Sequence, residues 1–504
     1  MKKQLVTSSV FRFIERIIVV VTSLLLTPFL IEVLGQQDYG LWILIISVLG
    51  WFNVIDLGFS TAVQRYIVLA LESDDHKKVN VIFSTAFALF GALGLFAASC
   101  LLILAQFPEL FGVDENTAPT LLIALSVLSM KVFWDFLMNS FHGIFSGLLR
   151  FDIDANLSSL NAISKALLVF YLVTEFNIYG AIFATLAADF LTNILKVFFA
   201  KRLYKNLKFS VKDVSAKELK SLFSFSKHVL AGGVAQTLNS KVDPILVTRL
   251  FDLSTVAIYS IASRLTGHIQ AFVSSVTGIF GPVFTKMVAR DENMAQIFTR
   301  IASINTFSAT ALFLPLLIFG GVFIRLWVGD EFESSIYILN ILVFSFMCKA
   351  VSTAVRNVLL AQANHKLISI VNLLGAIFNI GLSIILSQYW GVLGVASGTA
   401  IGFFISDVVL SLVLLNHYND FRLIPIIKCF CISIIIVFGL GLTGQYFVDL
   451  YMQRTWWSLV VYSVCSFPMI VLVCWFSLLD KGLRAKLVNL LKVKIQSKRA
   501  KTRS

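Results

Sequence analysis

The chain has 504 residues, of which 58% are hydrophobic and 14% charged, with a mean hydropathy of +0.87 and a net charge of +13. Soluble domains are typically about 45–50% apolar and about 25% charged, so the composition excludes an ordinary water-soluble protein. Apolar runs long enough to cross a bilayer as helices recur along almost the whole chain. These runs are unbroken, whereas the strands of a membrane barrel alternate apolar and polar residues. The sequence therefore predicts an all-α polytopic membrane protein.

Fourteen segments are predicted to span the membrane. The first follows a basic start, as in a signal peptide, but no small-residue cleavage site ends it, so we expect a retained helix. In chain order the predicted spans are about 12–34, 41–62, 79–106, 119–147, 153–174, 178–200, 222–249, 254–282, 298–324, 334–361, 367–388, 391–415, 429–447 and 456–479.

The distribution of positive charge predicts the orientation. With both termini in the cytoplasm, the inside segments carry most of the 41 Lys and Arg residues, and the outside loops carry only Arg249, Arg325 and Arg454. Because cytoplasmic loops are enriched in Lys and Arg, we expect both ends of the chain to be cytoplasmic. The outside loops are short, which argues against an enzyme that acts on that side, and we expect a transporter without a catalytic site.

Two sequence patterns recur at a nearly constant spacing, which predicts an internal repeat. "YGLW" (39–42) returns as "VAIY" (256–259), and "YGAIFAT" (179–185) returns as "LGVASGT" (393–399). Two bundles of six helices each would enter the membrane in the same orientation, with a substrate cavity between them. The predicted domains are an N-terminal bundle (1–200), a basic cytoplasmic linker (201–220), a C-terminal bundle (221–416), two additional peripheral spans (417–480) and a basic cytoplasmic tail (481–504).

Ionisable residues inside the predicted spans are candidates for the site. Each would cost about 3 kcal/mol if it faced lipid, so most must face a wet cavity or one another. Cations outnumber acids among them, which favours an anionic substrate. Lys131 and Asp135 are four residues apart and could instead neutralise each other on one helix. The predicted cavity cations are Lys131, Lys165, Lys241, Arg264 and Lys349.

The seventh predicted span carries a polar stripe at helical spacing. Lys241 flanks the stripe, and Pro244 interrupts the helix where protein or cavity must satisfy the backbone. A polar stripe is also compatible with packing of one helix on another, and that alternative stays open. The residues of the stripe are Gln236, Asn239, Ser240 and Asp243.

Four acids are candidates for carrying a coupling proton, because burial favours the neutral form of a carboxyl group. They are Asp56, Asp189, Asp243 and Asp407. Asp56 and Asp407 could alternatively cap a helix or form ion pairs. "FDID" (151–154) matches a metal-binding pattern of glycosyltransferases, but it lies in a short loop, and we interpret its acids as solvated. The cysteines show no metal-ligand spacing, so we expect no metal and no cofactor.

Three long stretches carry a recognisable pattern of Gly, Leu and aromatic residues: "LTPFLIEVLGQQDYGLWILIISVLGWFNVIDLGFSTAVQRYI" (26–67), "GIFSGLLRFDIDANLSSLNAISKALLVF" (143–170) and "LLAQANHKLISIVNLLGAIFNIGLSIILSQYWGVLGVASGTAIG" (359–402). They resemble the polysaccharide and O-antigen flippases of the multidrug/oligosaccharidyl-lipid/polysaccharide exporter superfamily. The resemblance implies a two-bundle fold that moves undecaprenyl-diphosphate-linked oligosaccharide across a bacterial inner membrane by alternating access, with suspected proton coupling.

The partners that this resemblance implies are the lipid-linked oligosaccharide, membrane lipids and other polysaccharide assembly proteins, and no nucleic acid. Three alternatives remain open: a cation-coupled multidrug exporter of the same superfamily, a flippase for the peptidoglycan precursor, and a membrane-embedded glycan transferase or polymerase. The sign of charge in the cavity separates the first from an oligosaccharide flippase, because a drug-cation exporter is expected to favour acids and aromatic residues.

Overall fold

The computed structural model describes residues 2–56, 58–277, 280–362, 364–418, 421–485 and 488–489. Within these ranges the chain is almost entirely helical and contains no strand. Among the described residues, ten helices are long and apolar enough to cross a membrane. The predicted all-α polytopic fold is confirmed, and the count of fourteen crossings stays a prediction. The chain forms two compact units, Met1–Ser260 and Ile261–Ser504.

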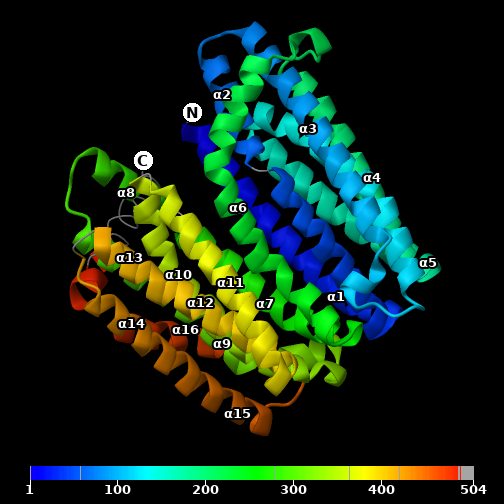
Figure 1. The fold of residues 1–504 in the computed structure, drawn as a ribbon. Coiled ribbons are helices and arrows are strands. Elements are labelled where there is room, and N and C mark those ends of the chain that lie inside the picture. The colour runs from blue at the N-terminus through cyan, green and yellow to red at the C-terminus, as the bar shows by residue number, and fades with distance from the viewer. Residues whose placement is uncertain are drawn as a thin grey trace, which may run out of the picture. The chain divides into compact units, whose positions relative to one another are not determined.

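The first unit is built around three neighbouring long helices, α3, α4 and α5, and α1 runs along α5 and α6 (Figure 1). Both α1 and α5 consist of two helices that meet at a kink, at Gly35 and at Asn177, and the two halves correspond to two predicted spans. The elements are α1 (Lys2–Phe52), η1 (Asn53–Asp56), α2 (Phe59–Glu72), α3 (His76–Ala105), η2 (Pro108–Phe111), α4 (Ala118–Gly147), α5 (Phe151–Leu203), η3 (Val211–Asp213), α6 (Ala216–Leu250) and the start of α7 (Leu253–Thr277).

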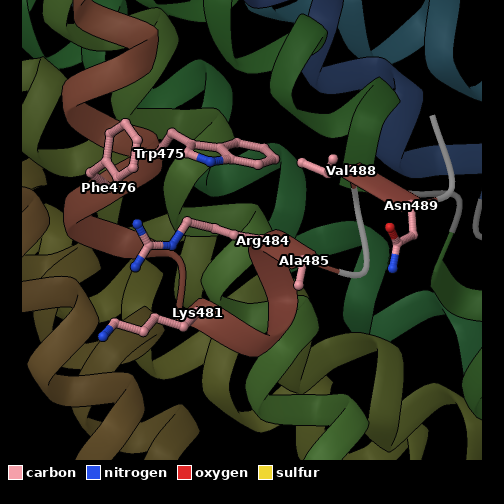
Figure 2. Close-up of a pocket in the computed structure, with 7 residues that line it drawn as sticks. All are labelled: Trp475, Phe476, Lys481, Arg484, Ala485, Val488 and Asn489. Atoms are coloured by element: carbon pink, nitrogen blue, oxygen red, sulfur yellow. The ribbon is translucent and has the colours of Figure 1, made fainter. Parts of the chain in front are cut away.

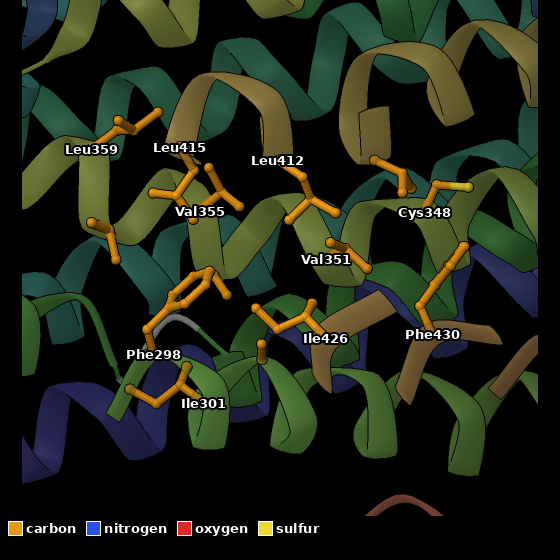
Figure 3. Packing of buried hydrophobic residues seen from close by; sticks show 14 of the residues in the cluster. Phe298, Ile301, Cys348, Val351, Val355, Leu359, Leu412, Leu415, Ile426 and Phe430 are labelled. Carbon is orange, nitrogen blue, oxygen red and sulfur yellow. The ribbon is translucent and has the colours of Figure 1, made fainter. Parts of the chain in front are cut away.

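The second unit continues with α7 and packs around α9 and α10. Phe298 of α9 and Val351 and Val355 of α10 belong to one buried apolar cluster, which Leu415 and Ile426 extend (Figure 3). The elements are α8 (Gly281–Ala289), α9 (Ala295–Val328), η5 (Asp330–Phe332), α10 (Ser334–Ala361), α11 (His365–Trp390), α12 (Val392–Phe403), η6 (Phe404–Leu410), α13 (Ser411–Tyr418), α14 (Ile424–Ile435), η7 (Ile436–Leu440), α15 (Gly441–Tyr451) and α16 (Trp456–Leu478).

The last helices, α14 to α16, pack along α9. Thr310 and Ser433 share a buried hydrogen bond of 2.6 Å between their hydroxyl oxygens. At the far end of α9, the Arg325 guanidinium donates to Asp449 at 2.7 Å and to Glu333 at 2.6 Å. The contacts of Thr310 with Ser433 and of Arg325 with Asp449 therefore hold α14 and α15 against α9 at two levels.

An open pocket of about 430 Å³ lies where α16 ends (Figure 2). Trp475 and Phe476 form its apolar side, and Lys481 and Arg484 supply two cations. The guanidinium carbon of Arg484 lies 5.1 Å from the centre of the Phe476 ring. Aromatic and basic side chains together are typical of the boundary between membrane and water, which is consistent with a span that ends at Leu478.

Two sharp turns have the same backbone geometry. Asn177, between the halves of α5, has φ 49° and ψ −133°, and Gly391, between α11 and α12, has φ 56° and ψ −140°. Three residues later, a Cβ on Gly180 would lie 2.1 Å from the Leu172 carbonyl oxygen, and Gly394 repeats this close approach at 2.2 Å. The two turns are separated by the spacing of "YGAIFAT" and "LGVASGT". The boundaries predicted for the bundles, linker and tail stay predictions.

Candidate functional site

Four ionisable side chains of α4 and α5 form one cluster in the first unit. The Lys131 ammonium pairs with Asp135 on its own helix and with Asp189 at 3.0 Å. The Lys165 ammonium lies 3.6 Å from the other carboxylate oxygen of Asp189. The local pair that the spacing of Lys131 and Asp135 predicts is therefore present, and Asp189 joins it to Lys165.

Neutral polar side chains complete this cluster. The Asn161 amide donates to Asp189 at 2.7 Å and to the Thr192 hydroxyl at 3.2 Å. The Asn193 amide donates to Asp135 at 3.0 Å. Each carboxylate thus accepts hydrogen bonds from ammonium and amide donors, which lowers the cost of holding charge away from water.

The cluster lies in the middle of its helices. Lys165 and Asp189 are each twelve residues from Asn177, about 18 Å along the helix axis at 1.5 Å per residue. The side chains of Lys131 and Asp189 are only 19% and 15% exposed. Two ammonium groups and two carboxylates cancel in charge, so a proton on one carboxylate would leave an excess positive charge. This arrangement can couple proton binding to attraction of an anion.

The polar face of α6 has partners in neighbouring helices of the first unit. The Tyr259 hydroxyl of α7 donates to Asp243 at 2.6 Å. The Trp51 indole of α1 donates to the Lys241 carbonyl oxygen at 3.2 Å, and Gly50 leaves room for the Lys241 side chain. Asp243 and Lys241 therefore both lie where α6 meets other helices.

The remaining residues of the stripe are only partly described. Asn239 is half-buried, and the side chains of Gln236 and Ser240 lie outside the described residues. In the second unit, Arg264 is a half-buried residue of α7. Lys349 lies over two aromatic rings, 4.1 Å from the centre of Phe403 and 4.8 Å from that of Phe346. Cation–π contacts of this kind stabilise an ammonium group within an apolar segment.

Two other candidate carboxylates occupy helix-end and π-helical positions. Asp56 accepts from the Ser60 backbone amide at 3.2 Å and from its hydroxyl at 2.8 Å, so its carboxylate satisfies one backbone amide in the first turn of α2. Asp407 is 7% exposed in the π-helical segment η6. Such segments often occur at functional sites, so Asp407 remains a candidate for coupling.

The expectation of a loop with solvated acids at "FDID" is wrong: residues 151–154 form the first turn of α5, and Asp152 and Asp154 are largely buried against protein partners. Asp152 accepts two hydrogen bonds of 3.0 Å from Arg150, and Asp154 lies 3.6 Å from the His142 ring. The Arg150 guanidinium therefore neutralises Asp152, and the two acids are directed to different residues. This geometry agrees with a structural role for both.

Sequence reasoning missed Asn161, Asn193 and Tyr259. Asn161 precedes Lys165 by four residues, and Asn193 follows Asp189 by four, so each lies on the same helix face as a charged candidate. Polar residues at helical spacing around a charge within an apolar span are the signal that predicts the two asparagines. Tyr259 lies on another helix than Asp243, and no spacing along the chain indicates that contact.

Comparisons with known proteins agree with a transport fold. The chain is 22% identical to the "Uncharacterized membrane protein EpsK" of Bacillus subtilis, over 79% of this chain and 81% of that protein. It is 21% identical to a Shigella flexneri protein named "Putative O-antigen transporter", over 73% and 87%. It is 25% identical to the "Probable low-salt glycan biosynthesis flippase Agl15" of Haloferax volcanii, over 40% and 43%.

Solved structures share the fold. The lipid II flippase MurJ in an inward closed conformation superposes with a TM-score of 0.74 at 18% identity, covering 93% of this chain and 98% of that chain. An inward-facing multidrug resistance transporter of the MATE family gives 0.69 at 14% identity, covering 82% and 99%. The sequence profile of a family described as polysaccharide biosynthesis proteins matches residues 4–288, more than half of the chain. The chain belongs to the polysaccharide biosynthesis protein family.

Proposed function

We propose that the chain is a flippase for a lipid-linked oligosaccharide, and that its cargo is an undecaprenyl-diphosphate-linked repeat unit of O-antigen or another surface polysaccharide. The observation that carries the proposal is the family match over residues 4–288, in a chain whose relatives include proteins named as an O-antigen transporter and a glycan flippase. The fold, which is that of the lipid II flippase MurJ, supports it. The membrane is the inner membrane of a bacterium, and other polysaccharide assembly proteins supply and consume the cargo.

The cargo carries a diphosphate, and the intramembrane cations match it in charge. Lys241, Arg264 and Lys349 attract the diphosphate during alternating access, and the polar face of α6 accommodates sugar hydroxyl groups. Arg and Lys are the side chains that bind phosphate most effectively. The potential across an energised membrane, negative inside, favours outward movement of this anion by about 2.3 kcal/mol per charge per 100 mV.

Lys131 and Lys165 are the other two cations in this proposal, and the protonation state of Asp189 controls their net charge. While Asp189 is ionised, it lies within ion-pair distance of both ammonium groups. When Asp189 takes up a proton, Lys131 keeps its pair with Asp135 and Lys165 loses its carboxylate partner, so the region becomes positive and attracts the diphosphate. Release of that proton restores the internal pairs and displaces the anion. Asp243, Asp407 and Asp56 are the other candidate coupling carboxylates.

Deletion of the gene, followed by analysis of the surface glycan and of lipid-linked intermediates, tests the proposed function. A flippase deletion is expected to lose the surface polysaccharide and to accumulate the completed lipid-linked repeat unit on the cytoplasmic side. The wild-type gene restores both. Accumulation of translocated but unpolymerised units would instead identify a polymerase or transferase, and the flippase proposal would be wrong.

The similarity to MATE transporters favours a second candidate, a cation-coupled exporter of small molecules. A panel of cationic drugs and dyes separates the two. If the chain is an exporter of small molecules, its deletion is expected to raise drug sensitivity and to leave the surface glycan intact. If the chain is a flippase, its deletion is expected to remove the surface glycan and to leave drug sensitivity unchanged.

The proposed role of the intramembrane cations in diphosphate binding is tested by substituting them in the gene that complements the deletion strain. Lys241→Ala or Arg264→Ala is expected to reduce surface polysaccharide at least tenfold at equal protein level. Lys349→Arg, which keeps the charge, is expected to retain more activity than Lys349→Gln. Wild-type polysaccharide in both alanine variants would contradict the diphosphate site.

Asparagine substitutions test the coupling carboxylates one at a time. The expected result for the true proton carrier is transport that no longer responds to collapse of the proton gradient. Transport that still depends on the gradient in Asp189→Asn would exclude Asp189 and leave Asp243, Asp407 and Asp56 to be tested in the same way.

A further inference from the structure

The segment that joins α5 to α6 is fixed to the side of α3. We call residues 204–215 the strap. The Asn80 side chain of α3 donates to the Asn206 carbonyl oxygen at 2.9 Å and accepts from the Lys208 backbone amide at 3.0 Å. One amide group thus pairs with two backbone groups of the strap, in the way that a neighbouring strand would. Leu207, between them, is buried.

Two hydroxyl groups of α3 extend this attachment along the strap. The Ser210 backbone amide donates to the Ser84 hydroxyl at 3.1 Å, and the Ser215 backbone amide donates to the Thr85 hydroxyl at 3.0 Å. Ser84 and Thr85 lie one turn beyond Asn80 on the same helix. One side of the strap is therefore fixed against α3, and the other side is left for solvent or a partner.

The side chains turned to solvent around the strap are mostly cations. Nine exposed basic residues lie on the strap, on the adjoining ends of α5 and α6, and on the first turn of α3: Lys77, Lys78, Lys201, Arg202, Lys205, Lys208, Lys212, Lys217 and Lys220. In the part of the chain that the structure describes, none of their side chains forms an ion pair.

Acids around the strap are fewer and partly engaged. They are Glu72, Asp74, Asp75, Asp213 and Glu218. Asp75 caps α3 by accepting from the Lys78 backbone amide at 2.9 Å, and Asp74 lies 3.6 Å from the His76 ring. The surface therefore keeps an excess of positive charge, and an anionic partner complements it.

The position of the strap and its apolar side chains point to lipid as that partner. One candidate span, α3, begins at His76, and another, α5, ends at Leu203. The strap follows Leu203 and contacts the start of α3, so it lies at the membrane boundary. Phe209, Val211 and Val214 are 47%, 75% and 39% exposed among the lysines. Cations interleaved with exposed apolar side chains at this depth are typical of segments that rest on an anionic membrane surface. A soluble polyanion would gain nothing from the apolar groups.

We propose that the strap and its flanking cations form a pre-organised binding face for anionic phospholipid headgroups of the leaflet on that side. The lysine ammonium groups donate to headgroup phosphate oxygens, and Phe209 and Val211 enter the interfacial layer. Because α3 already holds the strap backbone, binding does not have to order that segment. The proposal does not depend on which cargo the chain transports.

Native mass spectrometry of the purified full chain in detergent tests this binding face. The probes are phosphatidylglycerol and phosphatidylcholine with identical acyl chains. The variant Lys205→Gln/Lys208→Gln/Lys212→Gln is expected to bind phosphatidylglycerol at least about tenfold more weakly, since each cation near the surface is worth roughly fivefold. Binding of phosphatidylcholine is expected to stay unchanged.

A charge-matched control removes three exposed cations elsewhere, in Lys286→Gln/Arg422→Gln/Lys428→Gln. This control is expected to bind phosphatidylglycerol within about twofold of the wild type, because none of its three cations belongs to the strap or to the helix ends that flank it. Equal losses in the two triple variants would mean that net charge alone attracts the lipid, and the proposal would be overturned.

The variant Asn80→Ala tests the attachment of the strap to α3 separately from the positive charge. It keeps all nine cations and removes both hydrogen bonds of the Asn80 side chain to the strap. It is expected to weaken phosphatidylglycerol binding by a smaller factor, about threefold, corresponding to one net hydrogen bond. Binding equal to the wild type would overturn pre-organisation by α3.

Polyglutamate and inorganic phosphate serve as competitors. Displacement of the lipid by either at equal charge concentration would assign the face to a soluble anion and overturn the lipid proposal.

Discussion

Asp189 is the residue that joins the intramembrane charges of the first unit. It lies within ion-pair distance of Lys131 and Lys165 and accepts a hydrogen bond from Asn161. The sequence predicts the pair of Lys131 and Asp135, because their spacing of four places them on one helix face. The contacts of Asp189 with α4 and with the first half of α5 depend on the rotation and depth of each helix. Periodicity within one segment does not specify either quantity.

Asp189→Asn is expected to destabilise the protein by about 3 kcal/mol, because it leaves two largely buried ammonium groups with one carboxylate. Asparagine has nearly the same shape, so the effect reports charge rather than a cavity. Thermal unfolding of the purified protein at pH 7 measures it. The double variant Lys165→Met/Asp189→Asn is expected to regain part of the loss.

The exposed loop substitution Asp114→Asn is the matched control, since it removes the same charge in solvent. Surface substitutions of this kind usually change stability by less than about 0.5 kcal/mol. If Asp189→Asn were as mild as Asp114→Asn, the cluster would not contribute to folding, and its ionised pairs would not describe the native state.

Among the elements, the two sharp helical turns recur at the spacing on which the predicted internal repeat rests. Asn177 and Gly391 share a backbone conformation with positive φ, and Gly180 and Gly394 share a close approach to a carbonyl oxygen. The sequence reveals the constant spacing between "YGAIFAT" and "LGVASGT". It does not reveal the conformation of Asn177, because asparagine also occurs in ordinary helices and loops.

Asn177→Gly is expected to stabilise the protein by about 1 kcal/mol, since a residue with a Cβ is strained at φ 49°, ψ −133° and glycine is not. Gly391→Asn is expected to destabilise it by a similar amount. Thermal unfolding midpoints of the two variants, compared with the wild type, measure both effects. A fall in the midpoint for Asn177→Gly would mean that the asparagine side chain outweighs the backbone strain.

Gly180→Ala and Gly394→Ala are expected to reduce the yield of folded protein severely. A Cβ at 2.1 or 2.2 Å from a backbone carbonyl oxygen forces the two helices of each turn apart, at several kcal/mol. Size-exclusion chromatography of the solubilised protein gives the yield. Gly381→Ala is the control, because no atom lies within 4 Å of the added Cβ. Alanine there is expected to be neutral or to favour the helix by up to about 1 kcal/mol.

For the whole molecule, hydropathy predicts the fold class and the helical segments well, because a bilayer demands long apolar helices whatever their partners. The sharp kinks within α1 and α5 are less predictable, since the sequence does not show the non-helical backbone conformations of Gly35 and Asn177. The charged residues of the candidate site are predicted, whereas the neutral partners Asn161, Asn193 and Tyr259 are missed. Lys349 shows why: its ammonium group contacts two phenylalanines, and the sequence offers no reason to select those two rings from many.

The orientation of the whole chain is a prediction from charge, and reporter fusions test it. The strap and the adjoining ends of α5 and α6 carry seven Lys and Arg residues, whereas the segment around Asp114 is acidic. Positive segments are retained on the cytoplasmic side. A reporter that is active only in the cytoplasm is therefore expected to be active when fused after Ser210 or Ser504 and inactive after Asp114.

The opposite pattern at all three positions would invert the orientation and place the lipid-binding strap at the outer leaflet. A diphosphate cargo moving from the cytoplasm would then enter from the side of the acidic loop, which would argue against the proposed direction of transport.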